Sequence, residues 1–129
     1  MGDYQRTKNN KYFLPTAVYN KAIWEIRDYY RLRAESESIL EESPDPPDGL
    51  PRGTSVGNEV ESKAIKREKL KWKIEVIESN LEIIPEEYRR GVWKNIQYRT
   101  PYPKNADRTT YSRYKSQYIN AIATEMELI

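Results

Sequence analysis

A seam of apolar residues limits the stretch between positions 58 and 84 to an α-helix. Successive members are four, three, four and three residues apart: Leu70, Ile74, Ile77, Leu81 and Ile84. This heptad spacing places them on one side of a helix, whereas a half-buried strand would alternate. A regular seam requires a second helix to cover it. We expect a helix capped by Asn58 and ending at Ile84, paired within the chain or with a second copy in a homodimer.

Residues 15 to 42 show the same helical spacing. One face holds Val18, Ala22, Ile26 and Tyr30, with Tyr19, Ile23 and Leu32 beside them. Pro15 suits the first helical position, where a missing N–H costs nothing. We expect one helix from Pro15 to about Glu42. It would form an antiparallel pair with the 58–84 helix, giving a helical hairpin over residues 15–84 that follows a flexible basic arm of residues 1–14.

Residues 43–59 separate these two helical stretches. Four prolines and three glycines in this segment exclude a helix or a central strand. At 17 residues it is longer than most connections in a compact domain. Two interpretations stay open, a solvated linker or an ordered loop that meets the helices or a partner. Arg52 is its one basic residue and a candidate contact to a DNA backbone.

The C-terminal third predicts two further helices. The first begins at Pro85, has Glu86 and Glu87 near its N-terminus, and stops before Pro101. A connector follows, with room for one helical turn at Lys104–Ala106. The last helix, capped by Asp107 or Thr109, runs to about Leu128. Its buried side would hold Tyr111, Tyr114, Tyr118, Ile119, Ile122, Ala123 and Met126, and its exposed side Arg108, Thr110, Arg113, Ser116, Gln117 and Asn120.

Charge is segregated along the chain although the net charge is only +2. Residues 34–51 contain six acidic residues and no basic one, whereas residues 85–115 contain eight Arg/Lys and three Asp/Glu. A basic excess of this kind attracts polyanions. The last helix presents Arg, Thr and Ser side chains, which bind phosphate oxygens and base edges. The sequence therefore favours duplex DNA as a partner, although many basic amphipathic helices are merely solvated.

Composition argues against several other classes. The chain has no cysteine and no histidine, which removes disulfides, thiolate sites and the commonest general base and metal ligand. We expect no enzymatic activity, no cofactor and no metal site. No apolar run is long enough to cross a membrane, and the N-terminus has no apolar signal core, so a cytoplasmic location is expected.

Three blocks of the sequence resemble the RinA-type transcriptional regulators of temperate phages. They read "PPDGLPRGT", "IPEEYRRGVW" and "YPKNADRTTYSRYKSQYINAIATEMELI", and together they span roughly residues 44–129. The resemblance implies a phage- or prophage-encoded activator of late genes in a bacterial host cell. It also implies that residues 85–129 form a helix-turn-helix like region four of sigma factors. The implied DNA contacts are Arg108, Thr109, Thr110, Ser112, Arg113, Lys115 and Ser116.

The chain departs from a full helix-turn-helix in one respect. Only "TPYPKNA" lies between the two C-terminal helices, so the first helix of the motif is abbreviated. Two alternatives follow: the last helix sits at an altered angle on the duplex, or the acid-free segment "YRTPYPK" contacts the DNA backbone instead, through Arg99 and Lys104.

Two other functions are compatible with the sequence. A DNA-packaging component similar to a small terminase subunit would also join a helix-turn-helix to an oligomerisation part, and a ring-sized assembly would favour it. A helical protein-binding module acting on host RNA polymerase is the other. The acidic stretch "ESESILEESPDPPD" is its best support.

Overall fold

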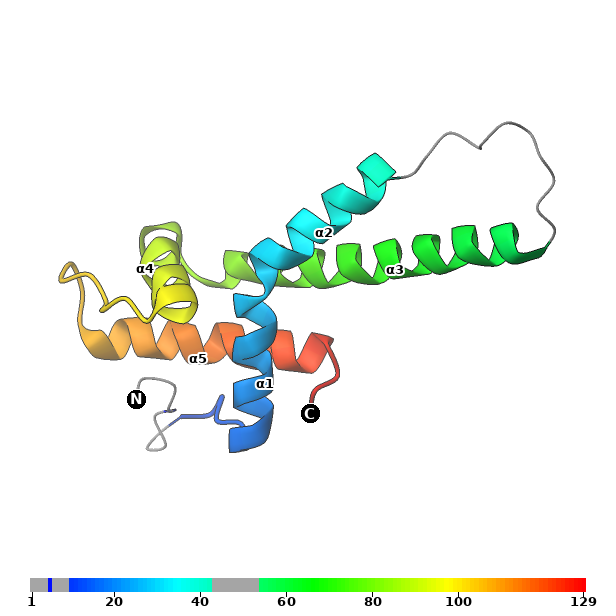
Figure 1. The fold of residues 1–129 in the computed structure, drawn as a ribbon. Coiled ribbons are helices and arrows are strands. Elements are labelled where there is room, and N and C mark those ends of the chain that lie inside the picture. Colours follow the sequence, from blue (N-terminus) through cyan, green and yellow to red (C-terminus); the bar gives the residue numbers. More distant parts are fainter. Residues whose placement is uncertain (1–4, 6–9, 43–53) are drawn as a thin grey trace. The chain divides into compact units, whose positions relative to one another are not determined.

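The computed structural model describes residues 5, 10–42 and 54–129, and this part of the chain contains helices but no strand (Figure 1). The all-α prediction is confirmed. Five α-helices and one 3-10 helix follow in the order α1 (Thr16–Arg27), α2 (Tyr29–Glu42), α3 (Thr54–Ser79), η1 (Asn80–Ile83), α4 (Glu86–Tyr98) and α5 (Arg108–Glu125). The chain divides into two compact units, one of residues 29–75 and one of residues 1–28 and 76–129.

The single helix predicted from Pro15 to Glu42 is wrong, because it is divided at Asp28. The Asp28 amide donates to the Trp24 and Glu25 carbonyls at 3.0 and 3.3 Å, closing α1 with a tighter turn. The Ile26 carbonyl at this point accepts a hydrogen bond from Gln97 Nε2 of α4, at 2.6 Å. A side chain from a distant element thus satisfies a carbonyl at the end of α1.

Three helix starts also differ from the predictions. Pro15 and Pro85 each stand one residue before the helix, at the N-cap. Asn58 lies inside α3, which begins at Thr54. All four prolines of the predicted loop precede Thr54, so the helix can begin just after them. The glycine within its first turns lowers helix stability but does not prevent a helix. The rest of that loop, residues 43–53 with Arg52, lies outside the described residues.

The heptad seam is buried in part. Leu70, Ile77 and Ile84 are buried as predicted, whereas Ile74 and Leu81 are half-buried. Within the unit of residues 29–75, Lys66 Nζ of α3 lies 2.8 Å from Glu35 Oε1 of α2. The antiparallel arrangement of two long helices stays a prediction.

In the other unit, α5 packs against α1, η1 and α4, and α1 also packs against α4. Buried side chains from α1, α4, α5 and the end of α3, with Ile84 just after η1, form its core. They include Tyr19, Ala22, Ile23, Ile26, Ile77, Ile84, Val92, Ile96, Tyr111, Tyr118, Ile119, Ile122 and Ala123. Two long-range hydrogen bonds support the packing: Tyr118 Oη donates to the Ile77 carbonyl at 2.8 Å, and Arg27 Nε to the Ile96 carbonyl at 2.7 Å.

Gly91 allows α4 and α5 to approach closely. A Cβ atom at this position would lie 2.7 Å from Tyr111 Cε1 and 2.8 Å from Pro103 Cδ. Both distances are well below ordinary carbon–carbon contact. The absent side chain therefore sets the spacing between α4, the connector and α5.

The connector between α4 and α5 covers residues 99–107. It starts at Arg99, whose backbone is left-handed (φ 58°, ψ 25°) and whose amide donates to the Asn95 carbonyl at 2.9 Å. Residues 104–106 form a turn and a bend, so the helical turn considered there is absent. Asp107 occupies the N-cap position of α5, as predicted, and Thr109 lies inside the helix. Whether α4 and α5 act as a helix-turn-helix stays a prediction.

Candidate nucleic-acid interface

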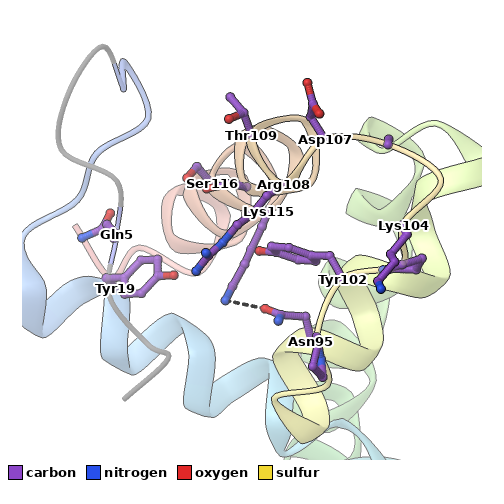
Figure 2. A pocket seen from close by; sticks show the side chains of 14 residues that line it. Gln5, Tyr19, Asn95, Tyr102, Lys104, Asp107, Arg108, Thr109, Lys115 and Ser116 are labelled. Atoms are coloured by element: carbon purple, nitrogen blue, oxygen red, sulfur yellow. Dashed lines mark hydrogen bonds between the residues drawn. The ribbon is translucent and has the colours of Figure 1, made fainter.

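A cavity of about 990 Å³ opens beside the first half of α5 (Figure 2). Its walls come from α5, from the connector, from Asn95 of α4 and from Tyr19 of α1, with Gln5 at one side. Six residues predicted to contact DNA line it: Lys104, Arg108, Thr109, Ser112, Lys115 and Ser116. The tertiary structure thus gathers most of the predicted set around one hollow.

Thr110 and Arg113 do not line this cavity. Successive helical residues are rotated by about 100°, so Arg113 projects roughly 140° away from Arg108 around the helix axis. The predicted contacts therefore divide into a cavity side, which contains Arg108, and an outer side, which contains Arg113. The exposure predicted for both arginines is confirmed, whereas the exposure predicted for Ser116 is wrong.

Two of the predicted contact residues are buried. Lys115 is 6% exposed and Ser116 is 8% exposed. The ammonium group of Lys115 donates to Asn95 Oδ1 at 2.7 Å. Because of this burial, a duplex lying against the outer surface of α5 does not reach these two side chains directly.

The N-terminal segment covers the second half of the polar face of α5. Asn10 Nδ2 donates to Ser116 Oγ at 3.5 Å, and Asn120 Nδ2 donates to the Tyr12 carbonyl at 3.2 Å. Gln5 binds both the amide and the carbonyl of Leu14, at 2.8 and 2.6 Å. Asn10 and Tyr12 of the predicted flexible arm are therefore hydrogen-bonded to α5, and Leu14 is bonded within the arm to Gln5. Residues 1–4 and 6–9 lie outside the described part.

The exposed cations of this region have few acidic residues near them in the sequence. Between Glu87 and Glu125 the chain has eight Arg/Lys and one acid, Asp107. Arg108 and Arg113 are exposed, and within the described part of the chain neither forms an ion pair. The Asp107 side chain makes no capping hydrogen bond to the start of α5. The positive end of the helix dipole is thus left without a side-chain cap, next to Arg108.

A cluster of four tyrosines holds the connector against α5. Tyr102 stacks on Tyr111 at 5.0 Å between ring centroids, and Tyr88 meets Tyr111 edge-on at 5.3 Å and stacks on Tyr114 at 5.5 Å. The Tyr111 hydroxyl hydrogen-bonds to Asn105. Burial raises the pKa of Tyr102 to about 12, with the positive charge of Arg108 acting in the opposite direction.

These contacts confirm most of the predicted core side of α5. Every predicted member is buried except Tyr114, which is half-buried. Because the Tyr111 ring is enclosed by Tyr88, Tyr102 and the α4 backbone at Gly91, it offers no free face to a nucleotide base.

The lining residues that the sequence did not predict include Tyr19, Asn95 and Tyr102. They belong to α1, α4 and the connector, and no local spacing relates them to α5. Only their packing around one helix reveals the association.

Comparison of the chain with protein-family models, curated protein sequences and solved structures found no match. In the described residues no helix is long and apolar enough to cross a membrane, and no cluster of acidic side chains could hold a metal ion. The fold and the site define the chain as an all-helical protein with a basic cavity beside its last helix.

Proposed function

We propose that this protein is a duplex-DNA-binding regulator of transcription that uses the first half of α5 to contact the duplex. The observation that carries the proposal is the pair of exposed arginines, Arg108 and Arg113, which have no acidic partner in the described structure. An arginine without an acidic partner can bind phosphate or the guanine edge with both arms of its fork.

The two arginines would contribute differently. Arg113, on the outer side of α5, is placed to enter a groove with Thr110. Arg108, next to the start of the helix, is placed to bind a backbone phosphate together with the helix dipole. Arg99 and Lys104 of the connector, both exposed, would add backbone contacts. The resemblance to RinA-type regulators supports activation of late phage genes as the role, with host RNA polymerase as a second partner.

Binding to duplex DNA should be measured by fluorescence anisotropy, on a sequence selected from a random duplex pool, at several salt concentrations. We expect Arg113→Ala to weaken binding by about 1–3 kcal/mol and to relax sequence preference at one position. Lys21→Ala, which removes one exposed charge from α1, is the control and should weaken binding far less.

Equal losses for the two variants would mean that only general positive charge attracts the duplex, and the proposed face would be rejected. Circular dichroism of each variant should keep its helical signal, since both side chains are exposed. Failure to select any preferred duplex would reject the regulatory function itself.

A protein-binding module is the second candidate, because α3 carries two exposed large apolar side chains. Ile65 is 69% exposed and Trp72 is 43% exposed. Seven residues apart, they lie on the same side of the helix. Loss of binding to purified host RNA polymerase on Ile65→Ser/Trp72→Ser substitution, with duplex binding unchanged, would favour this function.

A further inference from the structure

The N-terminal segment holds Lys11 beside the last helix. The residues on either side of Lys11 are both hydrogen-bonded to α5: Asn10 Nδ2 donates to Ser116 Oγ at 3.5 Å, and Asn120 Nδ2 donates to the Tyr12 carbonyl at 3.2 Å. The Tyr12 amide also donates to Asn10 Oδ1 at 3.0 Å, which closes a turn around Lys11. The backbone at Lys11 is therefore fixed against α5, while its side chain is exposed.

This turn is bound to the same side of α5 that carries Arg113. Asn120 follows Arg113 by seven residues, which is within about 20° of two full helical turns. The contact made by Asn120 is therefore displaced by about 10 Å along the helix axis from Arg113, with little rotation around that axis. Lys11 and Arg113 are both exposed, and within the described part of the chain neither forms an ion pair.

The separation along α5 matches the dimensions of a duplex. The major groove of DNA is roughly 12 Å wide and is bordered by the phosphate backbones. With Arg113 inside the groove, a cation held about 10 Å further along the helix lies at the level of a bordering backbone. A lysine ammonium binds phosphate as a point charge with three N–H donors. Lys11 Nζ lies 5.2 Å from the centroid of the Tyr12 ring, a contact that leaves the positive charge in place.

We propose that Lys11 binds a backbone phosphate of the duplex that Arg113 contacts, and that Asn120 positions Lys11 for this contact. The inference rests on the proposed function and adds the N-terminal segment to its DNA-binding surface. Because the segment is already bound to α5, the contact costs less ordering entropy than a contact from a free arm. The opposite arrangement, in which the segment covers α5 and competes with the duplex, predicts that releasing the segment strengthens binding.

The first measurement is fluorescence anisotropy with the selected duplex and with an unrelated duplex, over a range of salt concentrations. We expect Lys11→Ala to weaken binding to both duplexes about threefold or more, because a phosphate contact carries no sequence information. The slope of log affinity against log salt should become shallower by about 1. Lys11→Arg keeps the charge and should retain both the affinity and the slope. Lys21→Ala, which removes an exposed charge from α1, is the matched control and should change neither.

The second measurement uses duplexes that carry a neutral methylphosphonate at one backbone position at a time. We expect one position at which neutralisation weakens binding of the native protein but not of Lys11→Ala. Asn120→Ala should also be insensitive at that position, since Lys11 is then no longer held there. Lys11→Ala should cost little in the Asn120→Ala background, because the two residues act on one contact. A purely structural role of Asn120 would not remove sensitivity at a single phosphate.

The outcomes separate this inference from the proposed function. If Arg113→Ala weakens binding while Lys11→Ala does not, the proposed function stands and the inference is overturned. Stronger binding by Asn120→Ala, or an equal loss for Lys21→Ala, also overturns the inference. If the native protein binds no duplex, the proposed function fails and the inference fails with it. Circular dichroism checks the fold, and if Asn120→Ala loses helical signal, the Lys11→Ala results decide.

Discussion

Replacement of Gly91 by alanine tests whether the spacing of α4 and α5 is set by a missing side chain. The added Cβ would lie 2.7 Å from Tyr111 Cε1 and 2.8 Å from Pro103 Cδ. Carbon atoms prefer separations of about 3.5–4.0 Å, so these neighbours must retreat by roughly 0.7–1 Å. Neither can do so easily, because Tyr111 is fully buried between two other rings and Pro103 is a rigid ring.

The magnitude follows from two opposing terms. Overpacking of a core costs about 1–3 kcal/mol, whereas alanine in place of glycine stabilises a helix by about 0.8–1 kcal/mol. We expect Gly91→Ala to lower the free energy of unfolding by about 1–2 kcal/mol. For a chain of this length, that corresponds to a decrease in Tm of roughly 3–8 °C. The Tyr102 wall of the cavity should also move, because Tyr102 stacks on Tyr111.

Urea unfolding followed by circular dichroism at 222 nm measures this change. A matched cycle uses Pro103→Ala, which removes the Cδ and Cγ atoms that lie 2.8 and 3.2 Å from the added Cβ. Gly91→Ala should cost at least about 0.5 kcal/mol less in that background. If Gly91→Ala instead stabilises the native protein by about 1 kcal/mol, helix propensity alone governs the position and the close approach is not rigid.

Two further predictions concern the connector. Arg99→Gly should raise the free energy of unfolding by about 0.5–1 kcal/mol in urea titrations, because glycine adopts the left-handed backbone (φ 58°) without steric cost. Arg99→Lys should give no such gain, and a gain in that variant would refute the backbone explanation. Burial raises the pKa of Tyr102 to about 12 from the ordinary value of 10, so the folded state holds the hydroxyl proton more tightly than the unfolded state. The stability associated with this difference, about 2–3 kcal/mol, is present below pH 10 and lost as the pH rises toward 12. Tyr102→Phe should show a smaller loss between pH 9.5 and 11.5 than the native protein, and identical pH profiles would reject the burial effect.

The sequence by itself determined the helices and much of the core. The spacing of apolar residues in α5 predicted the burial of Tyr111, Tyr118, Ile122 and Met126, because a helix repeats every 3.6 residues whatever its neighbours. The same periodicity did not reveal the division at Asp28, because the Ile26 carbonyl beside it is bound by Gln97, which is distant in the sequence.

The site was determined only by the tertiary structure. Composition marked the first half of α5 as basic and polar, but it did not separate Arg108 from Arg113 or show that Lys115 is buried against Asn95. Those distinctions depend on which elements pack around α5, namely the N-terminal segment, the end of α4 and the connector. Side chains adjacent on one helix acquire different surroundings because burial is decided by contacts between segments far apart in the chain.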